Sequence, residues 1–159
     1  MTELEKKVDE LTGRVRRLED ELAIHRLIVR YGLAVDIGDP DQTAAVFAED
    51  GIYDADVRLM NGREDVRDMV RSERHQKMVG HCAHQIGPAI VKLNGDTALA
   101  VGYSRVYLRG ADGIGVYRVS YNRWQLERRD GAWLIVHRRT RLLGHDEAKA
   151  IFEGGLLEL

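Results

Sequence analysis

The chain has 159 residues, of which 44% are hydrophobic and 31% are charged, and this composition predicts one globular domain with a core of ordinary size. A formal net charge of -2, with arginines and glutamates interspersed, argues against a nucleic-acid-binding surface. The single cysteine, Cys82, excludes an internal disulfide, and the charged first ten residues predict neither a signal peptide nor a membrane span. We therefore expect a cytoplasmic protein that binds neither nucleic acid nor a membrane.

Apolar residues recur at alternating steps of four and three through the first thirty residues. They are Leu4, Val8, Leu11, Val15, Leu18, Leu22 and Val29, and His25 occupies the remaining position of the pattern. This heptad pattern, with valines mostly at position a and leucines mostly at position d, predicts a helix that packs on its own domain or on a neighbouring subunit. Gly38 and Pro40 interrupt the pattern, so the helix is expected to end near Val35 and to place Asp36 at its end.

Two further helices and one short strand are predicted before the middle of the chain. Residues 39–41 are suited to cap a short helix that continues to about Phe47. Residues 51–57 are typical of a short strand, with a turn at Asn61 and Gly62. A third helix is expected from about Arg63 to Gln76, with apolar residues on one face and charges on the other.

The second half of the chain changes from helical periodicity to alternation. Four long runs of alternating residues lie at about 79–93, 96–109, 114–128 and 132–143. Hairpin signals rich in glycine and aspartate separate them, which predicts four consecutive strands. Helices followed by an antiparallel meander predict the α+β class, with helices packed on one face of a strongly curved sheet. Such a sheet forms a cone, and a cone encloses a pocket.

Alternation along these strands predicts which side chains enter the cone. Ser104, Val106 and Leu108 share the face that we expect to point inward, whereas the tyrosines and arginines between them point outward. In the last strand, alternating arginines fit either an anion-binding site or a subunit interface, and we favour the interface.

Asp36 and His84 are the residues that suggest chemistry. A carboxylate that orients an imidazole is the minimal equipment for moving a proton to and from carbon. The alternative is that Asp36 merely ends a helix and that His84 is a buried histidine. His81 and His84 lie three apart on a strand and point to opposite faces, so together with Cys82 they do not predict a metal site.

Several short motifs, taken in order, carry a family resemblance over residues 20 to 143. They are Arg30-Tyr31 to Val35-Asp36, Phe47-Ala48-Glu49-Asp50-Gly51, Asn61-Gly62-Arg63-Glu64-Asp65-Val66, Ala83-His84-Gln85-Ile86-Gly87, and Leu126 to Trp133 leading into Ile135-Val136-His137-Arg138-Arg139. The chain resembles the nuclear transport factor 2-like superfamily, in its SnoaL-like branch that includes scytalone dehydratase and bile-acid 7α-dehydratase. The resemblance implies a cone-shaped, cystatin-like α+β barrel with no cofactor, a small hydrophobic substrate and a homotrimer or homodimer.

The resemblance also implies roles for particular residues. The catalytic residues would be Tyr31, Asp36 and His84, which stand where the dehydratases place a tyrosine, an aspartate and a histidine. We predict substrate contacts at Tyr53, Leu108, Asn122 and Arg141. Leu108 falls near the position of a further acidic residue in the bile-acid enzyme, so the substrate and the reaction need not match that enzyme.

We predict three segments and one main function. Residues 1–20 are expected to form a helical extension, residues 21–145 the SnoaL-like barrel and residues 146–159 a tail. The main hypothesis is a dehydratase, a lyase that removes water from a hydrophobic hydroxylated ring compound by acid–base catalysis. The alternatives are an isomerase or polyketide cyclase that uses the same pocket, and a non-catalytic ligand-binding or assembly module.

Overall fold

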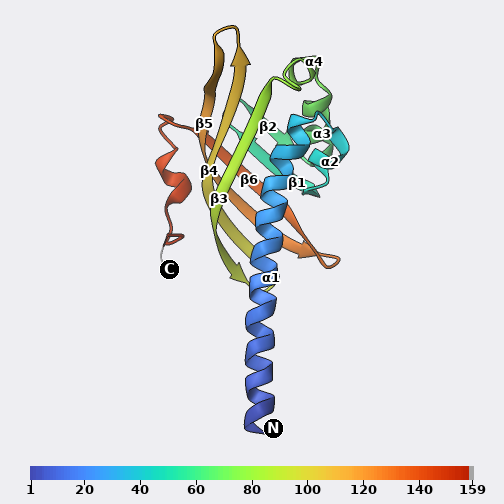
Figure 1. Ribbon diagram of the computed structural model, residues 1–159, viewed down its shortest axis with the longest axis vertical. Helices are drawn as coiled ribbons and strands as arrows, with labels where there is room; N and C mark the ends of the chain where they lie inside the picture. Colours follow the sequence, from blue (N-terminus) through green and yellow to red (C-terminus); the bar gives the residue numbers. More distant parts are fainter. Residues whose placement is uncertain (158–159) are drawn as a thin grey trace.

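The computed structural model describes residues 1–157 (Figure 1). The elements, in chain order, are α1 (Glu3–Asp36), α2 (Pro40–Ala44), β1 (Phe47–Ala55), β2 (Arg58–Asn61), α3 (Arg63–Arg71), α4 (Glu73–Gln76), β3 (Cys82–Asn94), β4 (Thr97–Gly110), β5 (Gly113–Arg129), β6 (Ala132–Leu142) and the 3₁₀ turn η1 (Lys149–Phe152). The order of helices and strands follows the predicted α+β layout.

Helix α1 begins and ends at local signals in the sequence. The Thr2 hydroxyl accepts the backbone N–H of Glu5 at 3.2 Å, and the Glu5 carboxylate accepts the backbone N–H of Thr2 at 2.6 Å, which together form a capping box. At the other end, Gly38 takes the left-handed conformation with φ of 70°, and Pro40 opens α2. The predicted helix end is confirmed, with Asp36 as the last helical residue.

The six strands form one curved, unclosed sheet in the order β2-β1-β6-β5-β4-β3 (Figure 1). The predicted antiparallel meander is confirmed for β3 to β6. Strand β1 pairs in parallel with β6, so the sheet is mixed rather than wholly antiparallel. β2, which was not predicted as a separate strand, closes a hairpin on β1.

Two predicted helix boundaries are wrong. α2 ends at Ala44, before Phe47, because Phe47 already pairs with Ile135 of β6. The third predicted helix is divided at Ser72, whose ψ of 142° breaks α3 and whose hydroxyl accepts the backbone N–H of His75 to start α4. Serine competes for backbone hydrogen bonds in this way and so favours a helix start over a helix interior.

The core lies between α1 and the concave face of the sheet. Ile24, Ile28 and Val35 of α1 are at most 2% exposed and pack in one cluster with the strand residues Trp124 and Ile135. The C-terminal segment covers part of the opposite face, on the far side of the sheet from α1 (Figure 1). Part of the outer sheet face is therefore covered by the chain itself.

The N-terminal half of α1 projects beyond the rest of the molecule (Figure 1). Asp20 is close to the point where the helix first meets the domain, because its carboxylate bonds Trp133 Nε1 at 3.1 Å and Arg128 at 2.7 Å. Although α1 has 34 residues, it carries too many charges for a bilayer, and no helix within residues 1–157 has a run of apolar residues long enough to cross one.

Candidate active site

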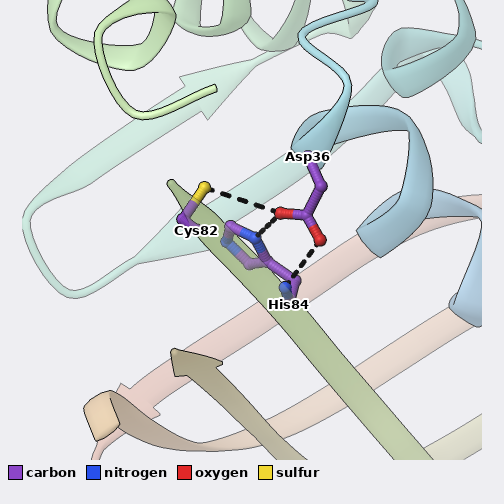
Figure 2. Close-up of side chains that lie close together, drawn as sticks. All are labelled: Asp36, Cys82 and His84. Atoms are coloured by element: carbon purple, nitrogen blue, oxygen red, sulfur yellow. Dashed lines mark hydrogen bonds and ion pairs between the residues drawn. The ribbon is translucent and has the colours of Figure 1, made fainter. Parts of the chain in front are cut away.

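Asp36 and His84 form a direct side-chain pair (Figure 2). Asp36 Oδ1 accepts the Nδ1–H of His84 at 2.5 Å, and Oδ2 accepts the backbone N–H of the same residue at 2.7 Å. Both side chains are less than 20% exposed. A carboxylate at Nδ1 fixes the tautomer in which Nε2 carries the lone pair, and it stabilises the imidazolium that forms when Nε2 accepts a proton.

The close approach of α1 to β3 makes this pair possible. Gly32, one turn before Asp36, lies against the backbone of His84, and a Cβ added at Gly32 would stand 3.0 Å from the His84 carbonyl oxygen. A glycine at this helix position brings the end of α1 within hydrogen-bond reach of the start of β3. The Asp36 carboxylate therefore meets both the ring and the backbone of one residue.

Cys82 is the third member of the cluster shown in Figure 2. Its thiol donates to Asp36 Oδ1 over 3.7 Å. Cys82 and His84 lie two residues apart on β3, so their side chains point to the same face (Figure 2). The prediction that the possible metal ligands point to opposite faces therefore does not apply to Cys82. Burial, together with the nearby Asp36 carboxylate, raises the pKa of the Cys82 thiol, which keeps it protonated and unsuited as a nucleophile.

These three residues are also a group that could hold a metal ion, because their ligand atoms all lie within 4.8 Å of one another. However, a thiol binds a metal only after it loses its proton, and the Asp36 oxygens already accept two N–H groups of His84. The arrangement fits an oriented imidazole better than a metal centre.

His84 lies at the wall of a cavity of about 260 Å³ between the sheet and the ends of α1, α3 and α4. This volume is just below the range of about 300–1,000 Å³ typical of pockets for drug-sized ligands, so it suits a small cyclic compound. Apolar side chains form much of its wall: Val35, Ala55, Val57, Met60, Met69, Met78 and Val106. The polar groups are Tyr31, Tyr53, Arg58, Ser72, Arg74, His75, His84, Ser104, Arg118, Ser120, Arg138 and Thr140.

Arg138 of β6 supplies a buried positive charge to this cavity. The residue is 2% exposed, and its Nε and Nη2 donate to the Asn122 side-chain oxygen at 3.1 and 2.8 Å. Its Nη1 is buried with no hydrogen-bond partner among residues 1–157. A buried donor without an acceptor is costly, so the position of Arg138 calls for an explanation beyond stability.

Tyr31 and Tyr53 hold the guanidinium of Arg138 in place. The guanidinium carbon lies 4.4 Å from the ring centre of Tyr31 and 4.6 Å from that of Tyr53, which is cation–π geometry. Burial raises the pKa of the Tyr31 hydroxyl above its ordinary value. Tyr31 therefore stays protonated and acts as a hydrogen-bond donor rather than as a base.

The structure brings only some of the predicted site residues together. Tyr31, Tyr53 and His84 line the cavity, and Asp36 supports His84 from behind. Asn122 is fully buried beneath Arg138 and is not part of the cavity wall.

Leu108 and Arg141 lie away from this cavity. Leu108 lies toward the β4–β5 hairpin, beyond a register shift between Val106 and Tyr107. Arg141 points to the other side of β6, where it binds Asp54 at 2.9 Å and Glu147 at 2.8 Å.

Sequence reasoning missed most of the polar residues in the cavity wall, and two of them, Arg138 and His75, make contacts that shape the site. Arg138 is one of them. Arg138 and Arg141 lie three residues apart on β6, so their side chains point to opposite faces of the sheet, and this alternation is the signal that could have identified Arg138. His75 is the other, since its Nε2 lies 2.8 Å from the Val35 carbonyl oxygen and thereby joins α4 to the end of α1. A carbonyl only accepts hydrogen bonds, so His75 Nε2 carries the proton, and this nitrogen is committed to a structural contact.

A profile of the SnoaL-like domain matches residues 16–139, a range that includes the Asp36–His84 pair and most of the cavity wall. The chain belongs to the SnoaL-like domain family. The predicted relationship is thus confirmed, and the fold agrees with it.

Solved structures show the same architecture. The chain is similar to an NTF2-like protein with a cystatin-like fold from Novosphingobium aromaticivorans, with 35% identity, a TM-score of 0.87, and coverage of 91% of this chain and 96% of that one. It is also similar to a variant of Rv3472, a protein of unknown function from Mycobacterium tuberculosis, with 27% identity, a TM-score of 0.72, and coverage of 89% of this chain and 79% of that one.

A candidate scytalone dehydratase from N. aromaticivorans is 19% identical, with a TM-score of 0.66 over 80% of this chain and 86% of that one. At this identity the likeness concerns the fold alone. No curated protein has a significant sequence match to this chain.

Proposed function

We propose that this SnoaL-like protein is a cofactor-independent acid–base enzyme, a dehydratase that removes water from a small hydrophobic, hydroxylated cyclic ketone. The observation that carries the proposal is the orientation of His84, whose Nδ1 is held by Asp36 while its ring lies at the wall of a cavity. Because Nδ1 is engaged, Nε2 is the ring nitrogen left to meet a substrate. A non-catalytic scaffold would not need a carboxylate to orient an imidazole beside a cavity.

In the proposed reaction, neutral His84 takes a proton through Nε2 from the carbon next to the substrate carbonyl. The electron pair of that C–H bond passes into an enolate, whose oxygen accepts a hydrogen bond from Arg138 Nη1 and from the Tyr31 hydroxyl. The enolate then collapses to a carbon–carbon double bond as the β-hydroxyl departs, and the His84 imidazolium gives it the proton, so that water leaves and His84 is neutral again. Asp36 stays ionised throughout and balances the transient imidazolium.

Two features of the cavity support this chemistry. Arg138 places a positive charge in the wall of the cavity, and such a charge would stabilise a developing oxyanion. The apolar part of the wall, which includes Met60, Met69 and Met78, suits a hydrophobic ring.

The alternative is an isomerase or polyketide cyclase. His75 Nε2 is committed to Val35, so His84 is the cavity histidine whose Nε2 is available to accept and return a proton. A single shuttling base also serves an isomerase, which has no leaving group. Mass spectrometry separates the two reactions, because only dehydration removes one molecule of water from the product.

The experiment starts with a thermal-shift screen of cyclic hydroxy-ketones, steroids and aromatic polyketides. Compounds that raise Tm are then incubated with the protein, and the products are measured by mass spectrometry. The matched variants are His84→Gln, which removes the base, and His81→Gln, which changes an exposed histidine three residues earlier on the same stretch of chain.

We expect His84→Gln and Asp36→Asn each to reduce kcat by about 100-fold or more, as for loss of a general base, and His81→Gln to leave kcat unchanged. Equal turnover by the wild-type protein and His84→Gln would refute the proposed mechanism. A compound that binds in the cavity and is never converted would favour the ligand-binding module.

A further inference from the structure

A continuous apolar stripe on α1 faces away from the domain that the helix helps to build. We define the seam as the six residues Leu4, Val8, Leu11, Val15, Leu18 and Leu22. Each of them is between 49% and 73% exposed. Exposed apolar residues in such an ordered row, on a helix that projects into solvent, indicate an interaction surface.

The domain itself does not use this surface. At about 100° per residue, the seam lies roughly 170° around the helix from the side that carries Asp20, Ile24 and Val35, which contact the sheet or the core. The exposed residues Val29 and Leu33 continue the stripe toward the end of α1. The seam is thus separate from the residues that fold the monomer.

We propose that the seam pairs α1 with α1 of a second copy of this chain, as a parallel, in-register, two-stranded coiled coil. The residue types at the heptad positions support this choice. Val8 and Val15 occupy consecutive a positions, and leucines occupy the three d positions of the seam. β-branched residues at a with leucine at d favour two parallel strands over three or four.

The charges that flank the seam also match a parallel pair. In that arrangement each g residue lies beside the e residue of the following heptad on the other helix. Arg14 then faces Glu19 of the partner subunit, and Glu21 faces Arg26 of the partner subunit, so each helix contributes two attractive pairs. Arg14, Glu19 and Arg26 are exposed and available for these contacts.

A fully overlapped antiparallel pair fits less well. It places Arg14 opposite Arg14 of the partner subunit and Glu5 opposite Glu19 of the partner subunit, and these repulsions oppose the attraction between Lys7 and Glu21 of the partner subunit. The parallel arrangement has no like-charge contact between the helices at these positions. Charge complementarity therefore selects orientation as well as partner.

The parallel pair has a consequence for the whole molecule. Because α1 is one continuous helix from Glu3 to Asp36, two parallel copies carry their domains at the same end of the coiled coil. Both candidate active sites, each at the end of its α1, then lie at one end of the dimer.

The test uses the full-length protein in analytical ultracentrifugation. We expect the wild-type mass to be twice the chain mass of 18.0 kDa. The double variant Leu11→Gln and Leu18→Gln should dissociate to monomers at concentrations at which the wild-type protein is dimeric. The matched control, Lys6→Gln and Arg17→Gln, introduces the same residues on the opposite side of the projecting helix and should remain dimeric, with far-UV circular dichroism confirming that all variants are folded.

Two further measurements test the orientation. In a Cys82→Ala background, Leu18→Cys should form an intermolecular disulfide on mild oxidation, because d residues face each other in a parallel pair. Glu19→Arg should weaken the dimer about tenfold or more, and adding Arg14→Glu should restore it. An antiparallel pair would instead be strengthened by Glu19→Arg, since the introduced guanidinium would then face Glu5 of the partner subunit.

Several outcomes would overturn the proposal. They are a monomeric wild-type protein, a trimer or larger assembly, and a dimer that survives the seam substitutions. The last outcome would assign self-association to another face, such as the outer face of the sheet. None of these results bears on the acid–base chemistry, which is tested by turnover.

Discussion

The substitution Gly32→Ala tests whether the tight contact between α1 and β3 positions the Asp36–His84 pair. In a helix interior, alanine is favoured over glycine by about 1 kcal/mol, so intrinsic propensity alone predicts stabilisation. The structure predicts the opposite. A Cβ at Gly32 would lie 3.0 Å from the His84 carbonyl oxygen, 3.4 Å from His84 Cβ and 3.4 Å from Ile86 Cδ1.

The neighbour that would have to move is backbone. His84 and Ile86 pair with Val106 and Ser104 in the β3–β4 ladder, so β3 has little freedom to yield. Overpacking of this kind costs about 1–3 kcal/mol, which outweighs the gain in helix propensity. We expect a net loss of about 1 kcal/mol in the free energy of unfolding, and an Asp36–His84 hydrogen bond that is longer than 2.5 Å.

The assay is urea denaturation followed by tryptophan fluorescence, with the His84 Nδ1–H proton observed by NMR. Gly13→Ala is the matched control, because a Cβ at Gly13 meets only Arg17 Nη1 at 3.9 Å. It should increase helicity in far-UV circular dichroism and leave the His84 resonance unchanged. If Gly32→Ala stabilised the protein and also left that resonance in place, the packing argument would be refuted.

Three further predictions concern buried polar contacts. The Arg141 guanidinium lowers the pKa of Asp54. A carboxyl group whose pKa is lowered by folding stabilises the folded state above about pH 4, and this stabilisation is lost as pH falls through the folded-state pKa. Asp54→Asn should therefore cost about 1–2 kcal/mol at pH 7 and progressively less below about pH 4 in denaturation curves. Trp133→Phe should cost about 1 kcal/mol by the same measurement, because it removes the 3.1 Å bond to Asp20; an unchanged midpoint would contradict this. Arg138→Met should change the free energy of unfolding by no more than about 1 kcal/mol, because the cost of burying the charge offsets the stabilisation from its hydrogen bonds. The same substitution should weaken ketone binding about tenfold or more in a titration.

Features that depend on neighbours in the sequence were predicted well. The heptads of α1, its end near Gly38 and Pro40, and the four long strands follow from residue spacing and turn chemistry that act over a few residues. The break between α3 and α4 at Ser72 was harder to predict, because the residues on both sides of Ser72 continue one helical pattern.

The least predictable feature was which side chains of a strand point into the cavity. Neither face of β6 is plainly apolar, and a slip of one residue exchanges the faces. Arg138 is directed into the cavity, whereas Arg141, three residues later, binds Asp54 on the opposite side. The register shifts in β4–β5 and β5–β6 change such assignments, because an extra residue on one strand reverses the face to which the following side chains point.

Residue spacing and the order of short motifs were enough to predict the long helix α1, the four long strands, the family and the candidate residues Asp36 and His84, because these signals can be read along the chain without knowledge of its packing. The packed fold was needed to learn that Asp36 holds Nδ1 of His84, that Cys82 joins them, and that Arg138 rather than Arg141 faces the cavity. The bonds of Asp36 to His84 join residues 48 positions apart, and their geometry depends on how closely α1 lies on a curved sheet. The seam of α1 shows both contributions at once, since its residues were visible as a repeat and the packed domain left them exposed.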